Sequence, residues 1–373
     1  MAPKRSRGAG ALERKKKTAL SPAPVSSGSN DLYAALDLGT NSCRMLIAQP
    51  KGGGFHVVDS FSKSVQLGAG LERTGRLSRG SMTRTVQALR ICQQKLRRNK
   101  VTRMRLVATE ACRRALNGDE FMRRVTRETG LRLDIIAPEQ EAQLAVISCA
   151  PLVSPKTENL LVVDIGGGST ELVWIDISEV PPKDRAQSIM RLHGGFLQAK
   201  TDVPAARVVD WISVPLGVAT LRDQFSDVED DAARFALMSW FFEENLTDFT
   251  PYQSAQPQER FQIVGTSGTV TTVAASHLGL RRYDRTKVDG LSMTSVQIDK
   301  VIHSYLAMGP VGRREDPCIG HDRSALIMSG AAILQALMRC WPTDRLSVAD
   351  RGLREGLLYA QMSADGVLEE GIF

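Results

Sequence analysis

The sequence predicts an α/β protein built from two related halves, and three observations support this fold class. Two segments share one pattern, a Gly-containing turn between two apolar runs: YAALDLGTNSCRMLIA at 33–48 and LLVVDIGGGSTELVWI at 160–175. They repeat the same three residues at a constant offset of 127 positions: Asp37, Gly39 and Ser42, then Asp164, Gly166 and Ser169. Strand-like and helix-like segments alternate after each copy. A chain of 373 residues is also long enough for two domains.

Each copy is expected to form a hairpin whose tip binds an anion. Successive backbone N–H groups at a Gly-rich turn form a concave anion site, and glycine lets a ligand approach the main chain closely. An aspartate at the end of the first strand is suited to hold Mg²⁺, directly or through water. Taken alone, either segment could be an ordinary hairpin turn. The duplication favours two phosphate-binding loops that clamp a phosphoryl chain between them.

The remaining elements follow from periodicity and capping. Met82, Val86, Leu89 and Leu96 lie on one helical stripe, which predicts a helix over 81–98. Strands are expected at 104–109 and 131–136, and helices at 117–130, where Gly130 is the stop, and at 138–150, where Pro138 suits the first turn. The second half begins with polar, Pro-containing residues 151–158. It continues with a strand, turn and helix over 261–275 and with three long helical patterns at 227–246, 295–309 and 324–340.

Charge and composition exclude several classes of protein. Residues 1–30 contain seven Lys and Arg and one Glu, so they carry nearly all of the net charge of +7. We expect a disordered basic tail there, which would bind nucleic acid only weakly, and no nucleic-acid site elsewhere. No apolar run reaches the roughly 18 residues of a membrane span. The six cysteines show no C-x-x-C pairing, which predicts reduced thiols and a cytoplasmic location. A P-loop is excluded because the chain has no Gly-Lys dipeptide.

Seven segments together resemble the exopolyphosphatase and guanosine pentaphosphate phosphatase family: DLGTNSCRMLI, ATEACRRALN, PEQEAQLA, VVDIGGGSTELV, SVPLGVATL, VGTSGTVTTVAA and RGLREGLL. The resemblance implies two ribonuclease-H-like domains of the actin, sugar-kinase and Hsp70 superfamily, which flank a cleft. We expect the domains at 31–155 and 156–350, and a C-terminal helix within 351–373 that packs back on the first domain. It also implies the short form of the family, without a C-terminal HD-type domain, and a homodimer.

The same resemblance implies roles for particular residues. Glu141 matches the catalytic glutamate, although Gln140 stands where the family has another Glu. Asp164 and Glu171 match the acids around Mg²⁺ and the attacking water, so Glu171 is both a catalytic and a metal candidate. Asp37 is a further metal candidate, with a structural role in the turn left open. The expected substrate-binding residues are Asn41, Ser42, Arg113, Gly166, Gly167 and Ser169.

These residues predict metal-dependent hydrolysis of the terminal phosphoanhydride bonds of inorganic polyphosphate, with release of orthophosphate. Two alternatives stay open, a guanosine pentaphosphate 5′-phosphohydrolase and a non-enzymatic alarmone or phosphate sensor. A sugar or acetate kinase would share the duplicated fold but has to keep water away from the phosphoryl group, whereas Glu141 is placed to activate water. A polyphosphate groove also needs basic residues, and the candidates are Arg281, Arg282, Arg285, Lys287, Arg313, Arg314 and Arg323.

Overall fold

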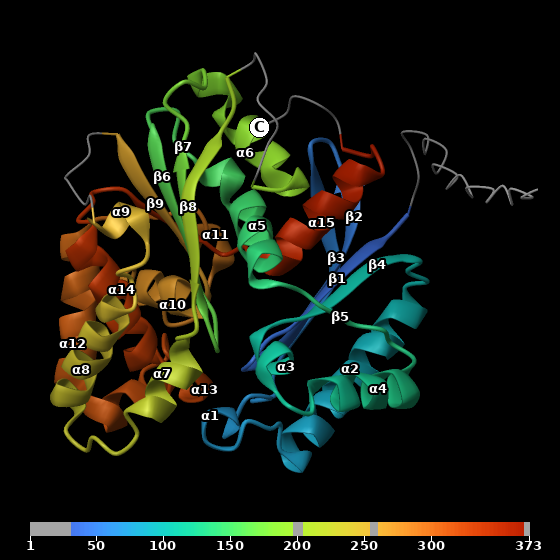
Figure 1. Cartoon of the computed structure of the whole chain (residues 1–373), viewed down its shortest axis with the longest axis horizontal. Coiled ribbons are helices and arrows are strands. Elements are labelled where there is room, and N and C mark those ends of the chain that lie inside the picture. The colour runs from blue at the N-terminus through green and yellow to red at the C-terminus, as the bar shows by residue number, and fades with distance from the viewer. Residues whose placement is uncertain (1–30, 197–203, 254–259, 369–373) are drawn as a thin grey trace, which may run out of the picture.

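Two mixed β-sheets organise the chain, one in each half (Figure 1). The computed structural model describes residues 31–196, 204–253 and 260–368. The predicted basic tail at 1–30 and the last residues of the predicted C-terminal segment, 369–373, lie outside these ranges. Among the described helices, none has both the length and the apolar character that crossing a bilayer requires.

The first sheet has the strand order β3-β2-β1-β4-β5. Its strands are β1 (Tyr33–Leu38), β2 (Ser42–Lys51), β3 (Gly54–Ser64), β4 (Arg103–Ala108) and β5 (Asp134–Ile135). Strands β1 and β2 form an antiparallel hairpin, and β4 lies parallel to β1 on its other side. One face is covered by α2 (Arg79–Arg98) and α4 (Gly118–Thr129), whose apolar residues join one core with Leu36 and Leu38.

The second sheet repeats this order and adds one strand at the edge. Its order is β10-β11-β9-β6-β7-β8. The strands are β6 (Asn159–Ile165), β7 (Thr170–Asp176), β8 (Arg207–Val214), β9 (Phe261–Thr266), β10 (Ser292–Met293) and β11 (Leu346–Ala349). One face packs on α8 (Asp231–Glu244), α10 (Gly268–His277), α12 (Ser295–Glu315) and α14 (Ile327–Cys340). Strands β8, β7, β6, β9 and β11 thus correspond to β3, β2, β1, β4 and β5, which confirms the predicted duplicated α/β fold.

Two helices lie between the sheets in the middle of the molecule, α5 (Pro138–Cys149) and α15 (Leu353–Ala364) (Figure 1). Two faces of α5 contact different layers: Ala142 and Val146 join the core under the second sheet, while Leu144 and Ile147 pack with α15 and the first sheet. The two helices are very close, because a Cβ added at Gly356 would lie 2.1 Å from the carbonyl oxygen of Leu144. Since α5 contacts both sheets, the domain boundary near residue 155 remains a proposal.

Most long elements begin and end near their expected residues. Gly130 ends α4 with a φ of 73°, the left-handed conformation that glycine adopts without strain. Two elements differ from expectation. The strand predicted over 131–136 pairs only at Asp134–Ile135. The helix predicted over 295–309 continues to Glu315 beyond a kink. The kink lies at Gly309, which has a φ of 65°, and Pro310 follows it in the first turn of the second helical segment.

Short helices fill the connections. They are α1 (Leu71–Thr74), α3 (Glu110–Arg114), α6 (Arg185–Met190), α7 (Val218–Gln224), α9 (Thr250–Gln253), α11 (Arg285–Val288) and α13 (His321–Ser324), with 3₁₀ turns at Ala150–Leu152, Pro182–Asp184 and Arg191–Gly194.

Candidate active site

The two predicted hairpins face each other where the halves meet. In each, the amide of the first glycine donates to the carbonyl oxygen three residues later, Gly39 to Ser42 and Gly166 to Ser169, both at 2.9 Å. The prediction of two matching hairpins is therefore confirmed. Their tips touch: a Cβ added at Gly167 would lie 3.2 Å from the backbone nitrogen of Asn41. A side chain at Gly167 would therefore crowd the facing loop.

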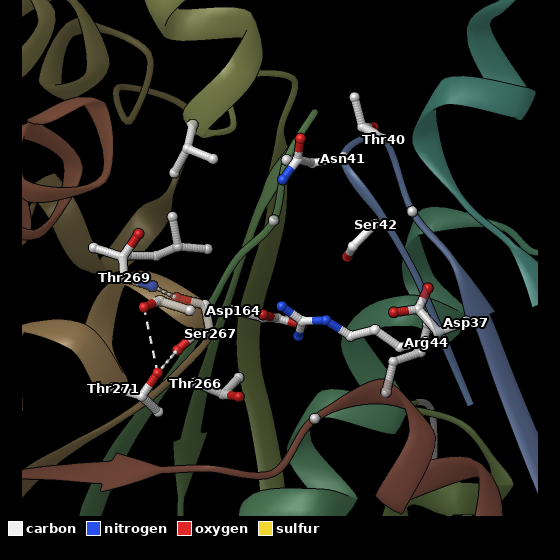
Figure 2. Close-up of a pocket in the computed structure, with 18 of the residues that line it drawn as sticks. Asp37, Thr40, Asn41, Ser42, Arg44, Asp164, Thr266, Ser267, Thr269 and Thr271 are labelled. Carbon is white, nitrogen blue, oxygen red and sulfur yellow. Dashed lines mark hydrogen bonds between the residues drawn. The ribbon is translucent and has the colours of Figure 1, made fainter. Parts of the chain in front are cut away.

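A cavity of about 340 Å³ opens between the loops. Most of the predicted site residues line it, namely Asp37, Asn41, Ser42, Glu141, Asp164, Gly166, Gly167 and Ser169. Figure 2 shows the first hairpin with Asn41 and Ser42 on one side and Asp164 with Ser267 and Thr269 on the other. Thr40 also lines the cavity, and its buried hydroxyl oxygen has no hydrogen-bond partner among the described residues.

Each hairpin places one residue directly opposite its aspartate. In the first, Arg44 of β2 pairs with Asp37, and in the second Glu171 of β7 pairs with Asp164. Figure 2 shows the Arg44 side chain extending from the first hairpin toward Asp164 of the second. Its charge lowers the pKa of both aspartates against the effect of their burial. Sequence reasoning missed Arg44, although it lies in the quoted segment DLGTNSCRMLI.

Four carboxyl groups lie in or next to the cavity, and desolvation raises the pKa of each: Glu141 and Glu171, which are buried, and Asp37 and Asp164, which are half-buried. Their mutual repulsion adds to this effect. The pKa of Asp164 rises to about 6 because the side chain is desolvated and because Asp37 is near. Because of this repulsion, the four groups do not all lose their protons readily. A cation bound among the carboxylates would relieve the repulsion.

Glu141 lies in the first turn of α5, and this helix begins at the cavity. Pro138 starts the helix, and Glu141 is only 9% exposed. Burial and then the charge of Glu171 raise the pKa of Glu141 well above its ordinary value, while Arg113 lowers it. A carboxylate with a raised pKa at the edge of a cavity is typical of a general base.

Arg113 and Glu171 lie behind the cavity wall. Arg113 donates to the carbonyl oxygen of Ile136 at 2.7 Å and to Oε2 of Glu141 at 3.3 Å. Glu171 is 2% exposed, and its Oε1 accepts a hydrogen bond of 2.8 Å from Ser213 on β8. Neither belongs to the residues that line the cavity.

The carboxylates of the cavity fit a Mg²⁺ ion that is shared with the substrate. Among the described residues, no three acidic, His or Cys side chains converge closely enough to form a metal site on their own. Mg²⁺ commonly takes one or two protein carboxylates and completes its shell with water and substrate phosphates. The cavity offers Asp37 and Asp164 for this purpose, so an ion shared with the substrate fits and an all-protein cage does not.

A third Gly-containing turn contributes to the far wall. Ser267 has a φ of 130°, and its side chain accepts from the amides of Thr269 and Val270 at the start of α10. Ser267, Gly268, Thr269 and Thr271 line the cavity. The strand, turn and helix were predicted there, but their place in the site was not. Of the basic candidates, Arg323 also lines the cavity, whereas Arg313 is buried against Asp231 in an ion pair of 2.8 Å.

Comparison with known proteins agrees with this site. The model of the Ppx/GppA phosphatase family matches residues 46–365, most of the chain. The chain belongs to the Ppx/GppA phosphatase family. The matched range contains Glu141 and the second hairpin, and the turn of the first hairpin precedes it.

Individual relatives match most of the length of this chain. The chain is 30% identical over 332 residues to a guanosine-5′-triphosphate,3′-diphosphate pyrophosphatase of Aeromonas salmonicida (strain A449), covering 88% of this chain and 59% of that one. It thus spans about three-fifths of the length of such relatives. The Aquifex aeolicus family member has a TM-score of 0.69 and 30% identity, with 89% and 98% of the two chains covered. An exopolyphosphatase from Cytophaga hutchinsonii ATCC 33406 shares the fold, with a TM-score of 0.74, 20% identity, and 90% and 99% covered.

Proposed function

We propose that this protein hydrolyses the terminal phosphoanhydride bond of inorganic polyphosphate and releases orthophosphate. The observation that carries this proposal is the position of Glu141, a buried carboxylate with a raised pKa at the edge of a cavity between two glycine loops. The loops supply backbone N–H groups for a phosphate chain, and the carboxylate supplies a proton acceptor for water.

In the proposed reaction the terminal phosphoryl group lies between the loops. Asn41, Ser42, Gly166, Gly167 and Ser169 bind its oxygens, and the Arg44 guanidinium adds a positive charge. Glu141 takes a proton from a water molecule as the water oxygen bonds to phosphorus. The bridging P–O bond breaks, and its electron pair stays on the shortened chain. The products are orthophosphate and a polyphosphate one unit shorter.

We propose Mg²⁺ as the cofactor, held by Asp37 and Asp164 together with the substrate. Glu171 does not line the cavity and would act on Asp164 and the water indirectly. When bound, the ion neutralises charge on the phosphate oxygens. Glu171 is hydrogen-bonded to Ser213 and directly opposite Asp164 in the hairpin, which supports a role in orienting that aspartate and the water.

Guanosine pentaphosphate is the second candidate substrate, and one feature of the cavity favours it. Beyond the loops the cavity continues to Tyr283, Leu326 and Ile327, with Asp350 beside them. Aromatic and aliphatic side chains suit a nucleoside, whereas a carboxylate does not suit a bare polyanion. The name of the Aeromonas salmonicida relative points in the same direction. The expected homodimer and cytoplasmic location stay predictions.

The test is an orthophosphate-release assay on purified protein with Mg²⁺, run side by side on polyphosphates of several lengths and on guanosine pentaphosphate. We expect release from polyphosphate with the higher kcat/KM. A higher kcat/KM on guanosine pentaphosphate would select the second candidate. Tight binding of either compound without any release would identify a sensor and contradict the hydrolase.

A further inference from the structure

Glu110 is a buried acid beside the cavity to which the sequence assigned no role. It is the first residue of α3, directly after β4, and only 7% of it is exposed. It lines the cavity, whereas Arg113 does not. An exposed ion pair between residues three apart on a helix contributes little to stability. A buried carboxylate, in contrast, requires a partner of opposite charge, and the pair is then held in one geometry.

The hydrogen-bond partner of Glu110 is Arg113, and Nε of Arg114 forms a longer ion pair of 3.6 Å with the other carboxylate oxygen. Oε2 of Glu110 accepts from Nη2 of Arg113 at 2.5 Å and from Nε at 3.1 Å. On its other side the guanidinium donates to Oε2 of Glu141 from Nη1 at 3.3 Å and from Nη2 at 3.4 Å, and Nη1 also donates to the carbonyl oxygen of Ile136. Glu110, Ile136 and Glu141 therefore hold the planar guanidinium from three directions, which prevents it from turning.

This arrangement leaves Arg113 committed to protein groups. Its Nε and both terminal nitrogens already donate to the carboxylates and to the carbonyl oxygen. A phosphate oxygen could bind only after one of these bonds had broken. Arg113 is thus better placed to fix the carboxylate of Glu141 than to bind the substrate.

We propose that Glu110 is a positioning residue for hydrolysis: it holds the guanidinium of Arg113, which in turn fixes the carboxylate of Glu141 toward the water. This inference rests on the proposed function. A general base must stay within hydrogen-bond reach of the proton that it takes, and a displacement of about 1 Å can cost roughly 10²-fold in rate.

Glu110 also contacts the second half of the molecule. A Cβ added at Gly168 would lie 2.9 Å from Cγ of Glu110, so the side chain packs against the second glycine loop. The same acid therefore lies between that loop and Arg113.

The experiment measures kcat and KM of full-length protein for orthophosphate release from polyphosphate with Mg²⁺. Glu110→Met removes the acceptor at similar length, and Glu110→Gln retains one neutral oxygen. We expect kcat to fall about 10²-fold for Met and less for Gln, with KM within about twofold of wild type. Glu128→Gln is the matched control, because Glu128 accepts from Arg124 at 2.7 Å and from Arg90 at 2.9 Å and does not line the cavity. Its kinetics should equal those of wild type.

A double-mutant cycle with Arg113→Lys separates positioning from packing. If Glu110 acts through the guanidinium, Glu110→Gln should cost little once Arg113 is lysine, so the two losses are not additive. Arg113→Lys alone should lower kcat with KM unchanged, which tests the chain of contacts even if a Glu110 variant does not fold. Additive losses, or a change in KM at constant kcat, would overturn the proposal. A wild-type protein that releases no orthophosphate would instead contradict the hydrolase function itself.

Discussion

Arg44 and Glu171 occupy the same position in the two duplicated hairpins, each directly opposite an aspartate of the neighbouring strand. The aspartate is therefore present in both copies, as Asp37 and Asp164, whereas the residue across from it differs in the sign of its charge. In the first half a cation faces the carboxylate, and in the second half another carboxylate does. The two hairpins are consequently asymmetric in charge at this position.

We expect Arg44→Gln to raise KM by at least about tenfold. The guanidinium lines the cavity and is the side chain best placed to pair with phosphate oxygens near Asp37 and Asp164. Loss of a charge-assisted bond costs roughly 1.5 to 3 kcal/mol, equivalent to about tenfold to a hundredfold. Steady-state kinetics on polyphosphate measure this. An unchanged KM would exclude Arg44 from substrate binding.

The contact between the two glycine loops predicts a graded effect of added methyl groups. A Cβ at Gly168 would lie 2.5 Å from Oγ1 of Thr40, compared with 3.2 Å for the nearest atom at Gly167. We expect kcat/KM to fall for Gly167→Ala and to fall further for Gly168→Ala, because the loops would be held apart. The thermal midpoint should change by only a few degrees, since about 1 kcal/mol corresponds to roughly 2 to 4 °C at this size.

Gly80→Ala is the control for the loop variants. Gly80 lies in the first turn of α2, where an added Cβ would meet only Nη1 of Arg84 at 3.6 Å. Its kinetics should match wild type, and helix propensity predicts a slight gain in stability. If Gly168→Ala kept wild-type kinetics as well, close contact of the loops would not be needed for turnover.

Mg²⁺ should stabilise the protein through Asp164. Burial and the neighbouring acids oppose the ionised form of this carboxyl group, so a bound cation removes an unfavourable interaction. We expect Mg²⁺ at about a hundred times its dissociation constant to raise the free energy of unfolding by roughly 2.7 kcal/mol. In Asp164→Asn this thermal shift should be largely lost, while the midpoint without cation should rise.

Asp176→Asn serves as the control on the same hairpin. Asp176 ends β7 at the opposite end from the site, where it pairs with the exposed Arg207 at 2.7 Å. This variant should retain the full Mg²⁺ shift in differential scanning fluorimetry. An equal shift in Asp164→Asn would show that the ion binds elsewhere.

Glu141→Gln should lower kcat by about 10²- to 10⁴-fold, because the amide keeps the shape of the side chain and cannot accept the proton of water. Substrate affinity should change little. Glu139→Gln is the matched control, since Glu139 lies in the same turn of α5 and is exposed. Near-normal turnover of Glu141→Gln would mean that another group is the base.

The sequence predicted the features that depend on local pattern. Gly turns between apolar runs specify hairpins, and the register of each hairpin carries Asp37 and Asp164 to the same place, so the two loops followed from the repeat. Features that depend on packing between distant segments could not be predicted. Nothing near Glu110 in the sequence indicates that Arg113 turns toward Glu141, 28 residues away, rather than toward the cavity.

Arg44 illustrates a different limit. The alternation of side chains along β2 places Arg44 on the same face as Ser42. To place Arg44 opposite Asp37, however, one must know the register of β1 and β2. That register depends on the turn between them, which closes through the amide of Gly39. Position 44 was therefore predictable in principle from the repeat, by asking what stands where the second copy has Glu171.

The central claim is that water, activated in this cavity, attacks the terminal phosphoryl group of polyphosphate. The most direct measurement is the isotopic composition of orthophosphate released in ¹⁸O-labelled water by wild type and by Glu141→Gln. Our account predicts one ¹⁸O atom in each orthophosphate released by wild type, and a rate reduced by about 10²-fold or more in the variant. Unlabelled orthophosphate from wild type, or equal rates for the two proteins, would contradict it.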